Sequence, residues 1–167
     1  MERDVQDPII TFEARSEWFG LAARDVQEVA RLRGVRPVPC APGVIAGLAE
    51  VHGRIVTLID LDRLMAPGGE SAARGPATER SGDEYGVVLA PPRDHLGILV
   101  RSGVDVSSAV TADAEPPPGE ASGWLQARLP VGDRLLNLLS LPALVLRVEH
   151  TIRRGFGPGP AAPDEEC

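Results

Sequence analysis

The chain has 167 residues, enough for one domain or two small ones, and 17 basic against 24 acidic side chains give a formal net charge of −7. This acidic balance argues against nucleic acid as a partner, because phosphate binding needs a basic surface. The chain contains no lysine, which excludes a P-loop lysine or a Schiff-base lysine of its own. Hydrophobic residues make up 43% and aromatic residues only 4%, so the sequence predicts an aliphatic core.

The N-terminal part reads as short strands followed by a stiff loop. Residues 9–14 and 17–22 are largely apolar runs two residues apart, which is the length of a hairpin turn, so they predict two paired strands. Residues 25–30 fit either a strand or one helical turn. Residues 36–43 contain three prolines, which remove backbone donors and fix φ, and they predict an extended loop.

Further strands are expected on both sides of residues 66–84, a segment rich in Gly, Ala, Ser, Pro and Glu that reads as a linker. Before the linker, residues 44–50 lead into residues 55–61, a run that is apolar on both faces and predicts a strand buried on both sides. After the linker, residues 85–90 and 96–100 predict a second pair of strands.

The C-terminal part predicts one more strand and a closing helix. Residues 134–141 form an apolar run typical of a buried strand, and Pro142 suits the first turn of a helix from about Ala143 to Ile152. Residues 155–167 are dominated by Gly, Pro and acidic side chains and predict a disordered tail, while residues 1–8 are expected to be a flexible N-terminus.

The sequence also repeats itself weakly. Residues 19–24 align with residues 96–101, an offset of 77 (96 − 19), and residues 54–61 align with residues 134–141, an offset of 80 (134 − 54). The order and the spacing of the two matches agree, and the period is far longer than that of a solenoid repeat. The repeat therefore predicts two similar half-domains of short antiparallel strands, for which small barrels are suited because they remove exposed sheet edges.

The residues offer little catalytic or metal-binding chemistry. The three histidines stand in no ligand spacing, and no G-x-S-x-G sequence marks a nucleophile. Asp60 and Asp62 near a strand end could hold a cation, although acidic pairs in solvated loops are common. The sequence therefore predicts no enzyme, no bound metal and no cofactor.

Two features favour a cytoplasmic protein. No apolar run near the start could serve as a signal peptide, and no stretch is long enough to span a bilayer, so no membrane insertion is expected. The two cysteines, Cys40 and Cys167, form no C-x-x-C pair, which fits a reduced cytosolic setting better than a small secreted domain.

Several segments, taken in order, resemble the CheW-like domain of bacterial chemotaxis adaptors, from about Ile9 to Arg147. The family reads roughly V-x-E-I, V-P-x-x-P, G, then N-x-R-G and an apolar strand ending in I-D-L. The matching segments are Val26–Val29, Val38–Pro42, Gly47, Gly53–Leu61, Leu96–Val100, Gly132–Leu136 and Leu138–Leu141. Their order and spacing over most of the chain make the resemblance fairly specific.

The resemblance implies a mainly β fold of two five-stranded, SH3-like antiparallel barrels with a short C-terminal helix. It implies a CheW-like domain over residues 9–154, with a first barrel at about 9–65, the linker at 66–84, a second barrel at about 85–147 and the helix ending at 154. The implied function is that of a non-enzymatic scaffold. It would couple the cytoplasmic tip of a chemoreceptor (a methyl-accepting protein) to the regulatory domain of a CheA-type histidine kinase, and cluster in the cytoplasm with receptor arrays.

The matching motifs also imply partner-binding positions. Val26 and Glu28 match the segment at the receptor- and kinase-contacting region, Gly47 and the loop through Gly53 match the kinase-side segment, and Gly97 matches a glycine implicated in coupling. Other roles are open for each: a tight turn or bulge for the glycines, core packing for Val26 and a solvated charge for Glu28.

One departure bears on the partner. The family's N-x-R-G stands here as Glu50-Val51-His52-Gly53, which adds Glu50 and His52 to the predicted partner-binding residues. Arginine presents a fixed fork of donors to carboxylates, which histidine does not reproduce. A divergent CheW-like module that binds only a receptor or another regulator is therefore an alternative. A small-ligand-binding β-barrel protein is another, and a deep apolar pocket between the barrels would favour it.

Overall fold

The structure is a computed structural model that describes residues 8–66, 83–108, 114–117 and 123–155. These residues form two five-stranded sheets, with the strand orders β8-β1-β2-β10-β9 and β3-β6-β7-β5-β4. The strands are β1 (Pro8–Ala14), β2 (Glu17–Ala22), β3 (Val26–Arg31), β4 (Ile45–Val51), β5 (Arg54–Ile59), β6 (Tyr85–Leu89), β7 (Leu96–Val100), β8 (Val104–Ser108), β9 (Leu125–Val131) and β10 (Arg134–Leu139). The helices are the 3₁₀ turn η1 (Ala23–Asp25), α1 (Leu61–Leu64) and α2 (Leu141–Gly155).

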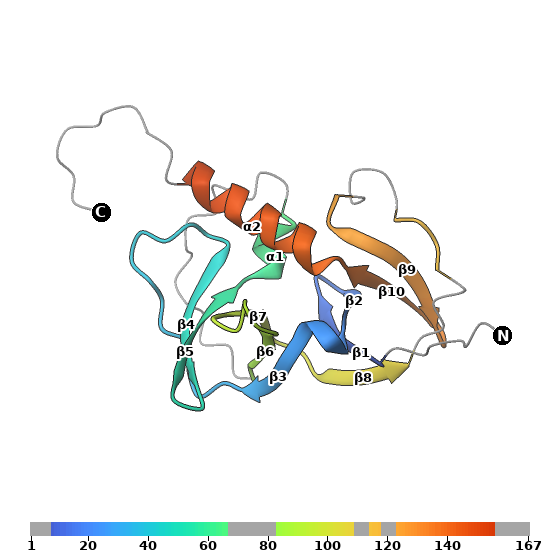
Figure 1. Ribbon diagram of the computed structural model, residues 1–167, viewed down its shortest axis with the longest axis horizontal. Coiled ribbons are helices and arrows are strands. Elements are labelled where there is room, and N and C mark those ends of the chain that lie inside the picture. Colours follow the sequence, from blue (N-terminus) through green and yellow to red (C-terminus); the bar gives the residue numbers. More distant parts are fainter. Residues whose placement is uncertain (1–7, 67–82, 109–113, 118–122, 156–167) are drawn as a thin grey trace.

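The first sheet combines strands from both ends of the chain, and the second combines strands from its middle, as the colours of Figure 1 show. The β1–β2 hairpin lies between β8 and β10, and the β6–β7 hairpin lies between β3 and β5. The predicted mainly β fold with two five-stranded SH3-like units and a closing helix is confirmed. The predicted division into one barrel at about 9–65 and another at about 85–147 is wrong. The β1–β2 hairpin completes a sheet with β8, β9 and β10, and the β6–β7 hairpin completes a sheet with β3, β4 and β5. This exchange also makes the sheets mixed, since β2–β10 and β5–β7 run parallel.

The predicted internal repeat is confirmed by the strand register. Thr57 of β5 pairs with Leu96 of β7, and Asn137 of β10 pairs with Phe19 of β2. The two pairs are related by the same offsets that the sequence shows, 80 residues (137 − 57) and 77 residues (96 − 19). Each sheet is therefore the hairpin of one repeat completed by three strands of the other.

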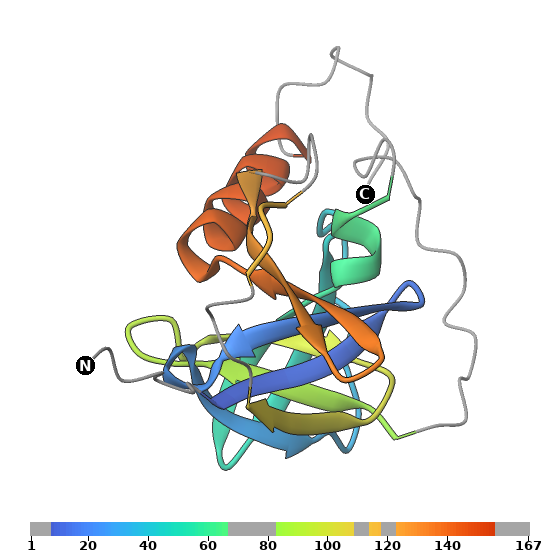
Figure 2. The same cartoon turned by 90° about the vertical axis from the view of Figure 1, so that its right-hand side faces the viewer.

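The core lies in three apolar clusters. The largest lies between the two sheets and takes Phe12 and Phe19 from the first, Val87 and Ile98 from the second, and the buried side of α2. The second and third clusters lie on the strands of the individual sheets. Their equivalent members, 80 residues apart, are Ala49, Val56 and Leu58 in one and Leu129, Leu136 and Leu138 in the other. Both views place α1 and α2 on one side of the sheets, opposite β3 and β8 (Figure 1 and Figure 2).

Several local features refine the sequence-based expectations. The ambiguous segment 25–30 contains the end of η1 and most of β3, so both structures that it suggested occur in succession. The strand expected to be buried on both faces is buried at Val56 and Leu58, but Ile55 is 63% exposed because it lies beside the hairpin turn at the end of the sheet. The closing helix continues past Ile152 to Gly155. Strands β8 and β9 were not predicted.

Two further expectations concern membrane insertion and the ends of the predicted segments. Among the helices of the described residues, none combines the length and the apolar content that crossing a bilayer requires. The predicted N-terminus, linker and tail fall largely outside the described residues.

Candidate partner-binding surface

The β4–β5 hairpin turns tightly at His52 and Gly53. Val51 pairs with Arg54, so the turn has two residues, and both have positive φ angles, 48° and 79°. This pattern is typical of type I′ turns, whose twist fits that of the flanking strands. Glycine adopts such angles without steric cost, whereas a histidine there is uncommon. The turn leaves the His52 side chain exposed but within reach of β3.

Four polar side chains from three parts of the chain meet beside this turn and form the rim cluster: Glu28, His52, Arg54 and Asp94. Glu28 Oε2 lies 2.7 Å from His52 Nδ1, and Glu28 Oε1 lies 3.4 Å from Arg54 Nη2. Arg54 Nη1 donates a hydrogen bond of 2.7 Å to Asp94 Oδ2. The Glu28 side chain is only 23% exposed, so its contacts are partly shielded from solvent. The guanidinium of Arg54 is therefore shared between two carboxylates of the same chain.

The outer side of the hairpin, next to the rim cluster, combines an apolar residue with a free charge. Ile55 is paired across the strands with Glu50, and both side chains are exposed. Strand alternation explains this direction, because the neighbouring Val56 points into the core. Within the described part of the chain, the Glu50 side chain makes no hydrogen bond or ion pair. An exposed aliphatic side chain rimmed by charge is typical of a docking surface.

Four of the seven partner-binding residues predicted from the sequence come together at this hairpin, namely Glu28, Glu50, His52 and Gly53. They belong to two strands and a turn that are separated along the chain, and the sheet order alone does not make β3 a neighbour of β4. The charged contacts between Glu28 and the turn bridge these elements. The structure thus gathers most of the predicted set into one surface.

The other three predicted residues lie within the fold. Gly47 is buried in β4 with a φ of 153°, and a Cβ atom there would lie 2.4 Å from the backbone oxygen of Arg36. Gly97 is buried in β7, where a Cβ atom would lie 3.2 Å from Val56 Cγ1. Val26 is half-buried and packs against the central core. Close packing of the backbone therefore accounts for both glycines, and their role toward a partner stays a prediction.

Sequence analysis missed three residues of this surface: Arg54, Ile55 and Asp94. An arginine at the start of an otherwise apolar strand was a usable signal, because a charge is tolerated there only if the position lies at the rim. Asp94 lies in the loop between β6 and β7, and only the three-dimensional fold brings it to Arg54.

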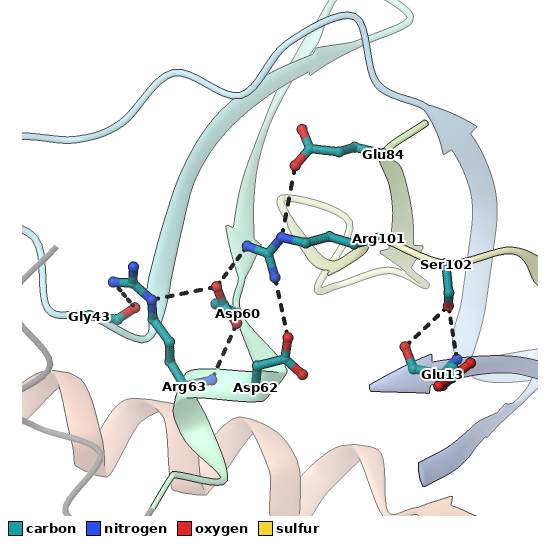
Figure 3. A network of polar contacts seen from close by, with 8 residues as sticks. All are labelled: Glu13, Gly43, Asp60, Asp62, Arg63, Glu84, Arg101 and Ser102. Carbon is teal, nitrogen blue, oxygen red and sulfur yellow. Dashed lines mark hydrogen bonds and ion pairs between the residues drawn. The ribbon is translucent and has the colours of Figure 1, made fainter. Parts of the chain in front are cut away.

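A second polar network lies at the start of α1 (Figure 3). Asp60 is buried, and its Oδ1 accepts the backbone N–H of Arg63 at 3.2 Å as a helix cap, while its Oδ2 accepts from Arg101 Nη2 at 2.9 Å. Asp62 and Glu84 lie 3.5 and 3.9 Å from the same guanidinium. Burial lowers the pKa of Arg101, but the hydrogen bond to Asp60 and the three carboxylate charges outweigh it and hold this pKa above its usual value. The oxygens of Asp60 thus serve the fold, which weakens the cation-site interpretation.

A small hollow lies beside this network, between the β1–β2 turn, α1 and the β7–β8 turn. Ser102 closes one side of it, where its hydroxyl contacts both the N–H and the carbonyl of Glu13 at 3.1 and 3.2 Å (Figure 3). The hollow has a volume of about 170 Å³, and charged and hydroxyl side chains make up much of its lining. Pockets for small molecules are usually larger, on the order of 300–1,000 Å³, and mostly apolar.

Comparison with known proteins identifies the family of this chain. The model of the CheW-like domain family matches residues 8–149, from the first described strand into α2. The chain belongs to the CheW-like domain family.

Two individual relatives agree with this assignment. The chain is 30% identical over 123 residues to the chemotaxis protein CheW of Treponema pallidum, a match that covers 72% of this chain and 68% of that protein. The crystal structure of the scaffolding protein TtCheW from Thermoanaerobacter tengcongensis is similar in fold, with a TM-score of 0.63. That match has 21% sequence identity and covers 82% of this chain and 86% of the other.

Proposed function

We propose that this CheW-like protein is a non-enzymatic adaptor that couples the cytoplasmic tip of a chemoreceptor to the regulatory domain of a CheA-type histidine kinase. The observation that carries the proposal is the β4–β5 hairpin of a CheW-like domain, which presents exposed Ile55 directly across the strands from the exposed Glu50. An exposed apolar residue with a charged surround suits a reversible protein contact.

An adaptor of this kind gains from presenting several surfaces at once. Two moderate contacts on one rigid body raise the effective concentration of each partner near the other, without requiring a single strong interface. The shared central core between the sheets supports such rigidity, because it packs side chains of both sheets and α2 together. In this proposal the protein acts in the cytoplasm and clusters with receptor arrays.

The alternatives receive less support. A ligand-binding β-barrel protein calls for a deep apolar pocket, and the hollow beside α1 is small and largely polar. A module that binds only a receptor or another regulator would leave the β4–β5 hairpin without a kinase to contact. These alternatives differ from the main proposal in a measurable way, because only the coupling adaptor binds both partners.

The direct test reconstitutes the signalling unit from purified components of the same organism. The protein is titrated into kinase and receptor fragments, and kinase autophosphorylation is measured together with co-sedimentation of the three proteins. We expect formation of a ternary complex and receptor-dependent control of the kinase. Binding of a receptor alone would support the receptor-only module, and binding of neither partner would overturn the proposal.

A further inference from the structure

The hairpin surface carries a surplus of negative charge. Glu28, Glu50 and Asp94 contribute three carboxylates, whereas Arg54 contributes one guanidinium. The remaining titratable group is His52, whose Nδ1 faces Glu28 at 2.7 Å. The three carboxylates and the guanidinium of this set sum to −2, so its fixed charges are acidic.

The position of the single arginine strengthens this result. Arg54 is held from two sides by Asp94 and Glu28, at 2.7 and 3.4 Å, so its charge is largely balanced within the chain. Glu50 has no such partner among the described residues and lies directly across from Ile55. A protein that approaches Ile55 thus meets the unpaired carboxylate of Glu50 next to an apolar side chain. The guanidinium of Arg54 is instead held by carboxylates of its own chain.

We propose that the β4–β5 hairpin docks on a kinase surface with a basic rim, in which an apolar recess receives Ile55 and lysine or arginine side chains face Glu50. This inference rests on the proposed contact with the kinase and specifies its chemistry. Charge complementarity is the reason, because opposite charges across an interface speed association and exclude wrong partners.

The second hairpin of the same chain supplies a matched comparison. Leu135 of β10 is equivalent to Ile55 and is also exposed, but it is paired with Pro130, and the residues before it in the sequence are one acid and one base, Asp133 and Arg134. Removing a charge there changes the charge of the protein without changing the proposed contact. Asp133→Asn is therefore the control for substitutions of Glu50.

The experiment titrates the full-length protein against the regulatory domain of the kinase from the same organism, by calorimetry at low and at moderate salt. We expect Glu50→Lys to weaken binding about tenfold at low salt, Glu50→Gln to weaken it about threefold, and Asp133→Asn to stay within about twofold of wild type. Raising the salt concentration should weaken wild-type binding more than binding of Glu50→Lys, because screening removes the attraction only where it exists. Glu50 is exposed, and thermal unfolding of each variant verifies that the fold is intact.

A second variant distinguishes a hairpin that binds a basic partner surface from one that binds an acidic partner surface. Arg54→Gln removes the only fixed cation of the rim cluster, so binding to a basic surface should be kept or strengthened. Tighter binding by Glu50→Lys, or a loss of more than about threefold with Arg54→Gln in a folded variant, would overturn the inference while leaving the kinase contact in place. Failure of the wild-type protein to bind the domain at either salt concentration would overturn the proposed coupling itself, and this inference with it.

Discussion

The hairpins β4–β5 and β9–β10 occupy equivalent places in the two sheets but present different surfaces. Each exposes one aliphatic residue on its second strand, Ile55 at 63% and Leu135 at 41%. Ile55 lies across from Glu50, whose side chain has no ion-pair partner among the described residues. Beside Leu135, Arg134 instead lies over the ring of Trp18, with its guanidinium carbon 4.1 Å from the ring centroid. The equivalent residue Arg54 is bound to carboxylates.

This comparison shows which part of a duplicated fold is free to change. The inward residues of both hairpins follow the same apolar pattern, because they fill the same kind of core cluster. The rim residues do not contribute to that packing and have diverged in charge and in partner. A repeat of this kind can therefore keep its fold while its two ends acquire different specificities.

The largest effect is expected at a backbone position where the hairpins differ. Gly47 corresponds to Ala127 in the other repeat, yet Gly47→Ala would place a Cβ atom 2.4 Å from the Arg36 oxygen at a positive φ. We expect the free energy of unfolding, measured with urea, to fall by about 3 kcal/mol. In Gly53→Ala the new atom meets nothing within 4 Å, and the backbone strain alone should cost about 1 kcal/mol. Equal losses would contradict the close approach at Gly47.

The second-largest effect is expected when the residue that precedes α1 is replaced by its equivalent in the other repeat, which precedes α2. Asp60 is equivalent to Ser140, and both accept the N–H of the residue four positions on through their backbone oxygens. Asp60→Ser can keep the cap but removes the ion pair with Arg101, so we expect a loss of about 2 kcal/mol in unfolding free energy. Asp62→Ser removes only the longer contact and should cost less than about 1 kcal/mol. A smaller loss for Asp60→Ser than for Asp62→Ser would disprove the ranking.

Two equivalent glycines test whether Gly97 acts in folding or in binding. A Cβ atom on Gly20 would lie 2.6 Å from Ile9 Cγ2, whereas the nearest atom to one on Gly97 is at 3.2 Å. We expect Gly20→Ala to cost about 2 kcal/mol and Gly97→Ala about 1 kcal/mol, as moderate overpacking does. Thermal unfolding and a kinase-domain titration are measured on the same samples. Lost binding with unchanged stability in Gly97→Ala would assign it to the interface.

The smallest effect concerns the polarity of the first hairpin. The double change Glu50→Asn and His52→Arg restores the family pattern at the turn. It should strengthen binding to a CheA regulatory domain whose own adaptor has that pattern by about tenfold, or about 1.4 kcal/mol, and weaken binding to the domain of the same organism. Parallel titrations against the two domains measure this shift. If neither affinity changes, the hairpin does not contact the kinase.

Sequence patterns predicted the strands that bury continuous apolar runs, and missed those whose polar residues interrupt the pattern. Strands β5 and β10 were evident because both are rich in Leu, Ile and Val. Strand β8 carries Asp105 between its two valines and ends in two serines, and β9 contains Pro130, which argues against a central strand. Both lie at sheet edges, where polar residues and proline are tolerated.

The repeat could be predicted, but the exchange of hairpins could not. The offsets show which residues are equivalent, and they say nothing about whether β1–β2 pairs with its own repeat or with the other. The residues that meet beside the β4–β5 hairpin could likewise be predicted only in part. The family motif located Glu28, Glu50 and His52, whereas the convergence of Arg54 and Asp94 depends on the relative placement of β3, β5 and the β6–β7 loop.

The exchange of hairpins also has a consequence for how this protein is made. Strand β2 ends at Ala22, but its parallel neighbour β10 begins only at Arg134, so the first hairpin leaves the ribosome long before its sheet can be completed. Pairings so distant in sequence are slow to form and leave strand edges exposed meanwhile. Neither repeat can finish a sheet alone. The nascent chain must therefore keep the β1–β2 hairpin soluble until synthesis is nearly complete, and a chain truncated before β10 should aggregate rather than fold by halves.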